Sequence, residues 1–266
     1  MGGAVLATAV VALAAPGMAS ALKARSVTTT TMDANDLLAA TAECKQGEHV
    51  ISGGFSSDEE SAAVISRAIK GRKWTVSLFA GTPTPSLTVS AYCSGSERVS
   101  RHSSSEDAPA DPADAAEGEA RCDSGESVVS GGHELAGLAV QDNSPVFSSR
   151  RAGKRGWSIS VFVANPPATL KTFAYCQRHV DVKVRSQQGD PIPDNGNGSV
   201  SASCHKGEKL LSGGYTTTPE SDFSNDFGPD FFFYRSSRSG RRQWTASAHN
   251  YSNIAGQITT FAYCKA

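Results

Sequence analysis

The sequence predicts an all-β protein built from one module that is repeated three times in tandem. Three segments share a Cys-x-x-Gly-Glu motif, a Ser-Gly-Gly triplet, a basic stretch, a single Trp and an Ala-Tyr-Cys ending. Around each Trp, apolar residues alternate with polar ones, which is the period of a strand with one buried face. Only residues 34–42 show a weak helical period. Repetition and alternation together favour many short strands.

The repeats divide the chain into three modules after a leader. Each module opens its motif with one cysteine and ends on another, and each contains one of the chain's three tryptophans. The distance from Trp to the closing Cys is 19, 19 and 20 residues. We assign the leader to 1–21, module 1 to 22–95, module 2 to 96–177 and module 3 to 178–266, and we expect about five strands in each module.

The expected strands follow the same order in every module. A lead strand is predicted at 26–31, 98–103 and 179–185. A strand from the motif Cys to the Gly-Gly pair follows, and because glycine tolerates unusual backbone angles, the pair should end or bulge it. A third strand lies before the basic stretch, at 63–69, 146–151 and 231–236. The last two carry the Trp and the Ala-Tyr-Cys ending. Between the lead strand and the motif Cys we predict flexible loops, including an acidic loop at 106–119 and a Gly-, Pro- and Asn-rich one at 187–199.

The leader has the features of a secretory signal. Residues 4–15 are apolar, Pro16 and Gly17 interrupt them, and Ala19-Ser20-Ala21 is a small-x-small cleavage pattern. No Lys or Arg precedes the apolar run, which is atypical of a signal peptide. The run is short for a membrane span, so an uncleaved anchor is the less favoured interpretation. We expect a secreted, extracellular protein whose mature chain has no transmembrane segment.

The six cysteines predict disulfides, because an even number follows an export signal. No C-x-x-C pair is present, so we expect neither a metal nor a cofactor. The repeat favours two pairings. One closes each module (Cys44–Cys93, Cys122–Cys176, Cys204–Cys264), and the other links neighbours (Cys93–Cys122, Cys176–Cys204, Cys44–Cys264). Closure is preferred because both cysteines occupy fixed positions in every module.

The Cys-x-x-Gly-Glu, Gly-Gly, Trp and Tyr-Cys pattern resembles a module found singly or in tandem in secreted bacterial proteins that generally lack an assigned function. This resemblance covers nearly the whole mature chain and implies no activity. Three β-rich, disulfide-bearing repeats are also similar to the pseudo-threefold β-prism of vitelline membrane outer layer proteins, whose modules are shorter. That resemblance implies architecture alone. We therefore expect a β-prism-like arrangement, with three separate small β-sandwich domains as the alternative.

The basic stretch before each Trp is the main candidate binding feature. It contains twelve of the chain's 25 basic residues. One interpretation is a solvated hairpin tip, where charge protects a strand edge from aggregation. The other is a threefold array of cationic loops that binds an anionic surface such as an acidic cell-wall polymer. The residues are Arg67, Lys70, Arg72 and Lys73 in module 1, Arg150, Arg151, Lys154 and Arg155 in module 2, and Arg235, Arg238, Arg241 and Arg242 in module 3.

Residues present in all three modules are expected to serve the fold, because a catalytic centre is normally built once. This applies to the Cys, Gly-Gly, Trp and Tyr positions and to the motif glutamates Glu48, Glu126 and Glu208, which we expect to pair with the basic hairpins. Module 3 alone has acidic residues spaced among phenylalanines, a candidate site for calcium or for stacking on sugars. These residues are Asp222, Asp226 and Asp230.

No nucleophile motif is present, and no catalytic residue is predicted. The formal net charge is −1 and no nucleic-acid motif accompanies the basic stretches, so a nucleic-acid partner is not expected. The sequence favours a secreted, non-catalytic binding or structural protein that presents loops to an extracellular surface, glycan or protein partner. The alternative is a secreted hydrolase with its site between repeats. A hydrolase needs one deep cleft lined by unrepeated polar residues, whereas a binding scaffold should show shallow, threefold-related surfaces.

Overall fold

A computed structural model describes residues 22–31, 37–58, 63–79, 85–109, 115–137, 144–163, 167–218, 231–251 and 254–266. The predicted signal peptide and the acidic residues Asp222, Asp226 and Asp230 lie outside the described residues. Their predicted roles therefore remain expectations.

The described residues form eighteen strands and no helix, which confirms the all-β prediction. Module 1 contains β1 (Lys23–Thr29), β2 (Leu37–Glu43), β3 (His49–Ser57), β4 (Ala63–Lys70), β5 (Lys73–Phe79) and β6 (Leu87–Ser94). Module 2 contains β7 (Ser100–Asp107), β8 (Ala115–Arg121), β9 (Glu126–Ala136), β10 (Val146–Ala152), β11 (Gly156–Phe162) and β12 (Thr169–Arg178). Module 3 contains β13 (Val182–Gln188), β14 (Asn197–Ser203), β15 (Lys209–Thr218), β16 (Phe231–Arg238), β17 (Gln243–Asn250) and β18 (Gln257–Lys265).

Each module has six strands where the sequence predicted about five. The additional strand (β2, β8 or β14) lies in the segment predicted to be a loop, so the predictions for 106–119 and 187–199 are wrong in part. It pairs along its length with the Trp strand of the same module. Its buried positions hold mostly small residues, such as Ala116 and Ala120 in β8, so it gives little apolar signal. The weak helical stretch at 34–42 is likewise wrong, since β2 occupies most of it.

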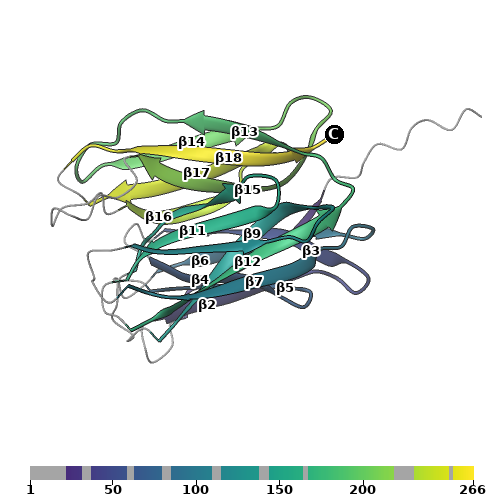
Figure 1. Ribbon diagram of the computed structural model, residues 1–266. Coiled ribbons are helices and arrows are strands. Elements are labelled where there is room, and N and C mark those ends of the chain that lie inside the picture. Colours follow the sequence, from purple (N-terminus) through teal and green to yellow (C-terminus); the bar gives the residue numbers. More distant parts are fainter. Residues whose placement is uncertain are drawn as a thin grey trace, which may run out of the picture.

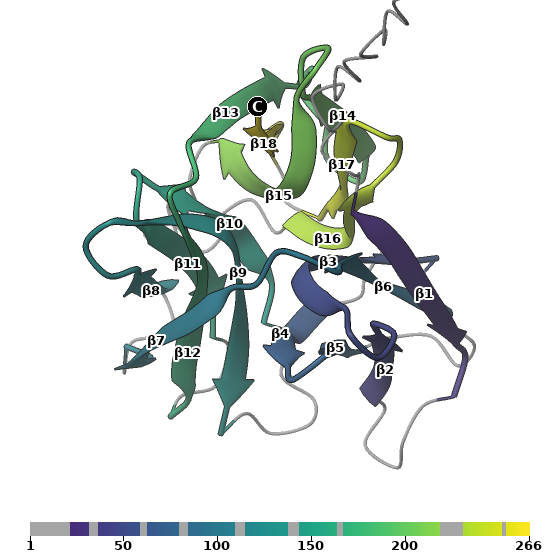
Figure 2. The same cartoon turned by 90° about the vertical axis from the view of Figure 1, so that its right-hand side faces the viewer.

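The three sheets are shared between modules. Each is antiparallel and six-stranded, with the orders β1-β6-β3-β16-β17-β14, β13-β18-β15-β10-β11-β8 and β2-β5-β4-β9-β12-β7. Every sheet therefore joins a lead half-sheet (lead, Ala-Tyr-Cys and Gly-Gly strands) from one module to a Trp half-sheet from another. The view along the strands shows three lobes around a common centre (Figure 2). The arrangement is consistent with a β-prism and excludes three separate domains.

Within each lobe, the two half-sheets of one module pack face to face (Figure 2). The first glycine of each Gly-Gly pair makes room for the Trp of the opposite layer. At Gly53, an added Cβ would overlap the Trp74 ring, and Gly131 and Gly213 have the same relation to Trp157 and Trp244. All three indoles are 0% exposed. The glycines thus lie inside strands, and the prediction that they end or bulge them is wrong. A bulge occurs instead next to the preceding serine.

At the centre, the modules meet along short junctions of two residue pairs between β3 and β16, β15 and β10, and β9 and β4. The second glycine of each pair lies at this junction, where a Cβ would overlap the neighbouring backbone. The preceding serines form a closed ring of hydrogen bonds from module to module. Ser52 donates to the carbonyl of Leu211, Ser212 to Val129 and Ser130 to Ile51, at 2.5–2.6 Å. Each acceptor is the bulged residue.

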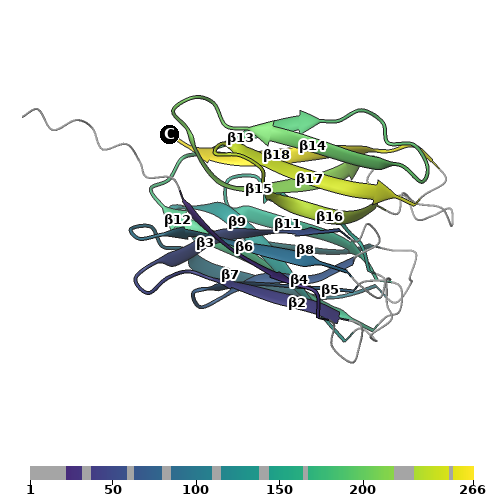
Figure 3. The ribbon, with the colours of Figure 1, turned by 180° about the vertical axis from the view of Figure 1, so that it is seen from behind.

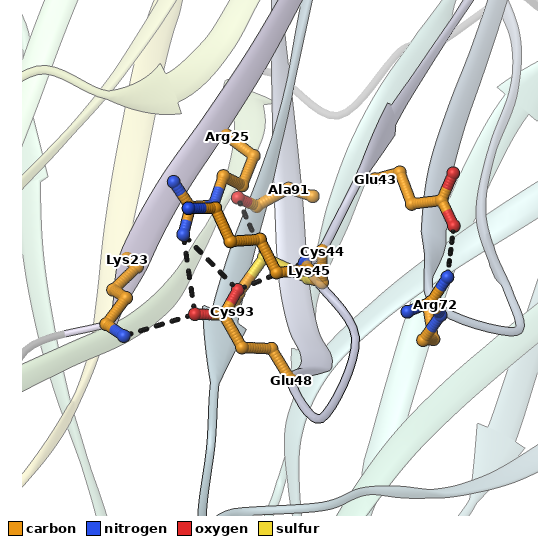
Figure 4. The surroundings of a disulfide bond; sticks show 9 residues. All are labelled: Lys23, Arg25, Glu43, Cys44, Lys45, Glu48, Arg72, Ala91 and Cys93. Atoms are coloured by element: carbon orange, nitrogen blue, oxygen red, sulfur yellow. Dashed lines mark hydrogen bonds and ion pairs between the residues drawn. A yellow bond between two sulfur atoms is a disulfide. The ribbon is translucent and has the colours of Figure 1, made fainter.

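Three disulfides join Cys44 to Cys93, Cys122 to Cys176 and Cys204 to Cys264, which is the pairing that closes each module. In each case the first Cys follows a strand of the Trp half-sheet and the second lies in the Ala-Tyr-Cys strand, so the bond ties the two layers of a lobe (Figure 4). The three bonds indicate an oxidising environment.

Candidate functional site

The connectivity places two different sets of links at the two ends of the strands. Links that join an even-numbered strand to the next odd-numbered one lie at the end that carries the C-terminus (Figures 1 and 3). We call this the turn end; its links are 44–48, 71–72, 95–99, 122–125, 153–155, 179–181, 204–208 and 239–242. They contain eight Lys or Arg and five Asp or Glu. The remaining links contain 14 Asp or Glu and no Lys or Arg in the sequence. Along the sequence the two sets of links therefore differ in charge, although the net charge of the chain is −1.

At the turn end, each motif glutamate is held by a backbone N–H of its own turn and by a side chain of its own lead strand. In module 3, the Glu208 carboxylate accepts the backbone N–H of His205 at 2.8 Å and pairs with Arg185 of the lead strand. The hydrogen bond from Arg185 lowers the pKa of Glu208 to about 2, against a smaller opposing effect of burial. Glu48 accepts the equivalent backbone N–H, from Lys45, and pairs with Lys23 of its lead strand (Figure 4). Glu126 likewise accepts the N–H of Asp123 and pairs with His102 of its lead strand. Their role is structural, as expected, but their partners are the lead strands and not the basic hairpins.

The basic residues of module 1 are largely neutralised or buried. Lys70 pairs with Glu134 of module 2 at 2.9 Å, and Arg72 with Glu43 at 2.7 Å. Lys73 lies 3.6 Å from the same Glu43. Arg67 is 1% exposed and lies in the core, so it offers nothing to an external ligand.

Two arginines fasten the hairpins of modules 2 and 3 to the next module. Arg238 donates its backbone N–H to the Tyr92 hydroxyl at 2.8 Å, and its guanidinium lies over the Tyr92 ring. The guanidinium also donates to the carbonyls of Leu22 and Arg241. Arg151 makes the equivalent contacts with Tyr263, Val182 and Lys154. In module 1 the backbone N–H of Ile69 still binds the Tyr175 hydroxyl, but no arginine covers the ring from that position.

Four hairpin cations remain available to a ligand. Lys154, Arg155, Arg241 and Arg242 are exposed, and none makes an ion pair with a described residue. Of the two remaining basic residues, Arg235 is half-buried with its Nε donating to the Ser237 hydroxyl, and Arg150 is also half-buried. Of the twelve predicted residues, four are therefore exposed, three are paired with acids, two fasten a hairpin to the next module, two are half-buried and one lies in the core. No sequence signal separates these groups within a single hairpin.

Three related open grooves lie where a hairpin meets the next module. One has a volume of about 410 Å³ and is lined by Tyr92, Ser26, Arg238 and Arg241 among others. The second, of about 400 Å³, includes Tyr263, Arg151 and Lys154. The third, of about 360 Å³, lies beside Tyr175 at the module 1 hairpin. A further open groove of about 440 Å³ lies on module 3 between β13 and β14. The three Tyr grooves repeat with the modules.

Two groups of side chains have metal-ligand proximity, but neither is suited to a metal. Each contains cysteines, Cys176 in one and Cys204 with Cys264 in the other, which are disulfide-bonded. Thiolates are thus not offered, and the carboxylates Glu126 and Glu208 are already engaged by their turns and lead strands.

Comparison with known proteins gives no assignment, because no protein-family model matches the chain and no curated protein matches it significantly. Within the described part of the chain, the structure has no helix of the length and apolar character needed to cross a bilayer.

Proposed function

We propose that this chain is a secreted, non-catalytic binding protein whose turn end binds an anionic cell-wall polymer. The observation that carries the proposal is the set of four exposed cations Lys154, Arg155, Arg241 and Arg242, which make no ion pair with a described residue and come from two hairpins at one end of the molecule. The three disulfides and the resemblance of the module to those of secreted bacterial proteins support export.

The hairpins are well suited to binding because their turns are held before a ligand arrives. The guanidinium of Arg151 donates to the carbonyl of Lys154, and that of Arg238 to the carbonyl of Arg241. Each buried tyrosine hydroxyl fixes one more backbone N–H of the same strand. Fixed turns lose less conformational entropy on binding, so more of the electrostatic attraction contributes to affinity.

The repeated grooves favour an extended ligand over a small substrate. Each groove is open, and related grooves recur between successive modules. A linear polyanion can contact two hairpins at once, and the second contact then benefits from a high effective concentration. The described residues of the remaining links include the acids Asp58, Asp190 and Asp194 and no Lys or Arg, so they would repel such a polymer, which favours one orientation of the protein on it.

The proposal is tested by binding of the purified mature protein to anionic cell-wall polymer over a range of salt concentrations. Affinity should fall steeply with salt, because each contact releases counterions. Replacing Lys154, Arg155, Arg241 and Arg242 together by Ser should weaken binding at least tenfold and flatten the salt dependence. The matched control compares Lys154→Ser with Lys171→Ser, since Lys171 lies in β12 away from the turn end and the charge change is the same.

Binding that ignores both salt and these substitutions would refute the proposal. Release of soluble fragments from the polymer by the wild-type protein would also refute it and would favour a hydrolase. Circular dichroism of each variant should match that of the wild type, because exposed charges usually change stability by less than about 0.5 kcal/mol.

A further inference from the structure

A buried arginine lies near the pseudo-threefold axis with no acid to balance it. Arg67 is in β4 at the junction with β9, where it is the register partner of His133. It is 1% exposed, and no carboxylate of the described residues makes an ion pair with it. Arginine keeps its proton under all ordinary conditions, so the positive charge cannot be removed by deprotonation. The centre of the protein therefore carries a formal charge that the adjoining protein groups do not neutralise.

The equivalent positions in the other modules hold serine, and the difference leaves donors without acceptors. Ser149 and Ser236 occupy the same place at their own junctions. Each hydroxyl accepts the indole N–H of its module's Trp, at 3.3 Å from Trp157 and 3.1 Å from Trp244. Arg67 has no acceptor to offer, so Trp74 Nε1 has no hydrogen-bond partner among the described residues. The Nε and Nη1 groups of Arg67 have none either.

The surroundings of the guanidinium are mainly aromatic. Its central carbon lies 5.7 Å from the Phe55 ring centroid and 5.8 Å from that of Trp74, and the Tyr215 phenol is adjacent. Among the described residues, the Tyr215 hydroxyl oxygen is the one polar side-chain atom placed to accept from the guanidinium, and it carries no negative charge. His133 uses Nε2 to donate to the carbonyl of Val64 at 3.1 Å, and burial lowers its pKa to about 4, so it is neutral near pH 7.

These contacts stabilise the cation only in part. The attraction of a cation to an aromatic ring is smaller than the cost of removing an unpaired charge from water, even after relaxation. Three N–H groups, Nε and Nη1 of Arg67 and Nε1 of Trp74, are buried together without an acceptor among the described residues. A water molecule could accept hydrogen bonds here, but it would leave the charge uncompensated.

We propose that the buried cluster of Arg67, Trp74 and Tyr215 near the axis binds one small monovalent anion of the halide class beside the guanidinium. The ligand must be small because the side chains around it are 0–1% exposed. It must be an acceptor without protons, because the unpartnered groups of Arg67 and Trp74 can only donate. The site is internal and independent of the polymer-binding turn end, and it exists once per chain because only module 1 has Arg at this position.

The direct test is diffraction from crystals of the full mature chain grown or soaked in bromide. An anomalous peak within contact distance of the Arg67 guanidinium and of Trp74 Nε1 is the expected result. Absence of such a peak at high bromide, or a fully occupied water in its place, would overturn the proposal. This measurement does not depend on the folding of any variant.

The second test is thermal and urea unfolding at constant ionic strength, with bromide or chloride exchanged for gluconate, which is too large to enter. Above its dissociation constant, each tenfold rise in halide should raise the folded-to-unfolded ratio by about tenfold. Arg67→Ser, which recreates the arrangement of modules 2 and 3, should abolish this dependence, and Arg121→Ser, at an exposed arginine outside the proposed binding surface, should retain it. An equal halide response in the wild type and in Arg67→Ser would mean that the anion acts elsewhere, and the proposal would fail.

Discussion

The contact between Gly131 and Trp157 gives the sharpest test of how each lobe is held together. Replacing Gly131 by Ala would place a Cβ closer than 3.0 Å to three atoms of the Trp157 ring, a distance that real Cβ atoms do not show. The ring cannot easily move, because it is 0% exposed, its Nε1 donates to the Ser149 hydroxyl, and it packs edge-to-face with Tyr263 at 5.5 Å between ring centroids. Either the indole or the strand must shift.

Overpacking of a core usually costs about 1–3 kcal/mol, and the anchored indole puts Gly131→Ala near the upper end. Trp157→Ala should cost about 3–5 kcal/mol, as large truncations in cores do. In the Trp157→Ala background the added methyl enters vacated space, so Gly131→Ala should cost nothing further. The double-mutant cycle should therefore give a coupling energy of about 3 kcal/mol between the two positions.

Urea unfolding followed by far-ultraviolet circular dichroism measures all four proteins. For a chain of this size, a loss of 3 kcal/mol should also lower the melting temperature by about 6–12 °C. Gly95→Ala is the matched control, since an added Cβ there meets nothing within 4 Å, and its effect should stay within about 0.5 kcal/mol. Equal costs of Gly131→Ala with and without the indole would refute this account of the Gly-Gly pair.

Three further outcomes follow from the geometry. Tyr263→Phe removes the acceptor of the Arg151 backbone N–H, so the free energy of unfolding should fall by about 1–3 kcal/mol; an unchanged value in urea titrations would contradict it. The pKa of Glu208 is about 2, below its ordinary 4.5, so its contribution is full above pH 4.5 and disappears as the pH falls towards 2. Glu208→Gln should therefore flatten the pH dependence of stability in that window, and parallel wild-type and variant curves would disprove this. Replacing the Cys122–Cys176 pair by Ala should cost about 2–5 kcal/mol, and a melting temperature equal to the wild type would exclude a stabilising bond.

The repeated motif made much of the fold predictable from the sequence. The Trp strand and the Ala-Tyr-Cys strand alternate large buried residues with polar ones, and both are found where the alternation indicated. The disulfide pairing followed from the fixed motif positions of the cysteines. The strand β8 was missed because its sequence AAEGEAR buries only alanines and a glycine, which resemble an acidic linker in composition.

The pairing of each lead half-sheet with a Trp half-sheet of another module could not be predicted in the same way. Alternation shows that a strand has a buried face, but it does not identify the strand that pairs with its edge. At the junction, Gly132 approaches the backbone at Arg67 because the two strands come from different modules. The pairing between modules also determines which basic residues are buried. Arg151 and Arg238 look equivalent to Lys154 and Arg241 in the sequence, yet they are half-buried because a tyrosine of the next module lies beneath each.

Repetition also explains how a chain with almost no net charge gathers basic hairpins at its turn end. In the antiparallel path of each module, links alternate between the two ends of the strands, so a bias in one set of links is always delivered to the same end. The modules are related by rotation about an axis that runs along the strands (Figure 2). Equivalent links of the three modules therefore lie at the same end, and their charges add. A single module would place one basic hairpin at its turn end, which gives weak attraction in salt. The closed arrangement of three modules brings the hairpins of modules 2 and 3 to one end, each fastened to its neighbour. The fold that buries the shared core thereby also brings the exposed cations of these two hairpins to one end of the molecule.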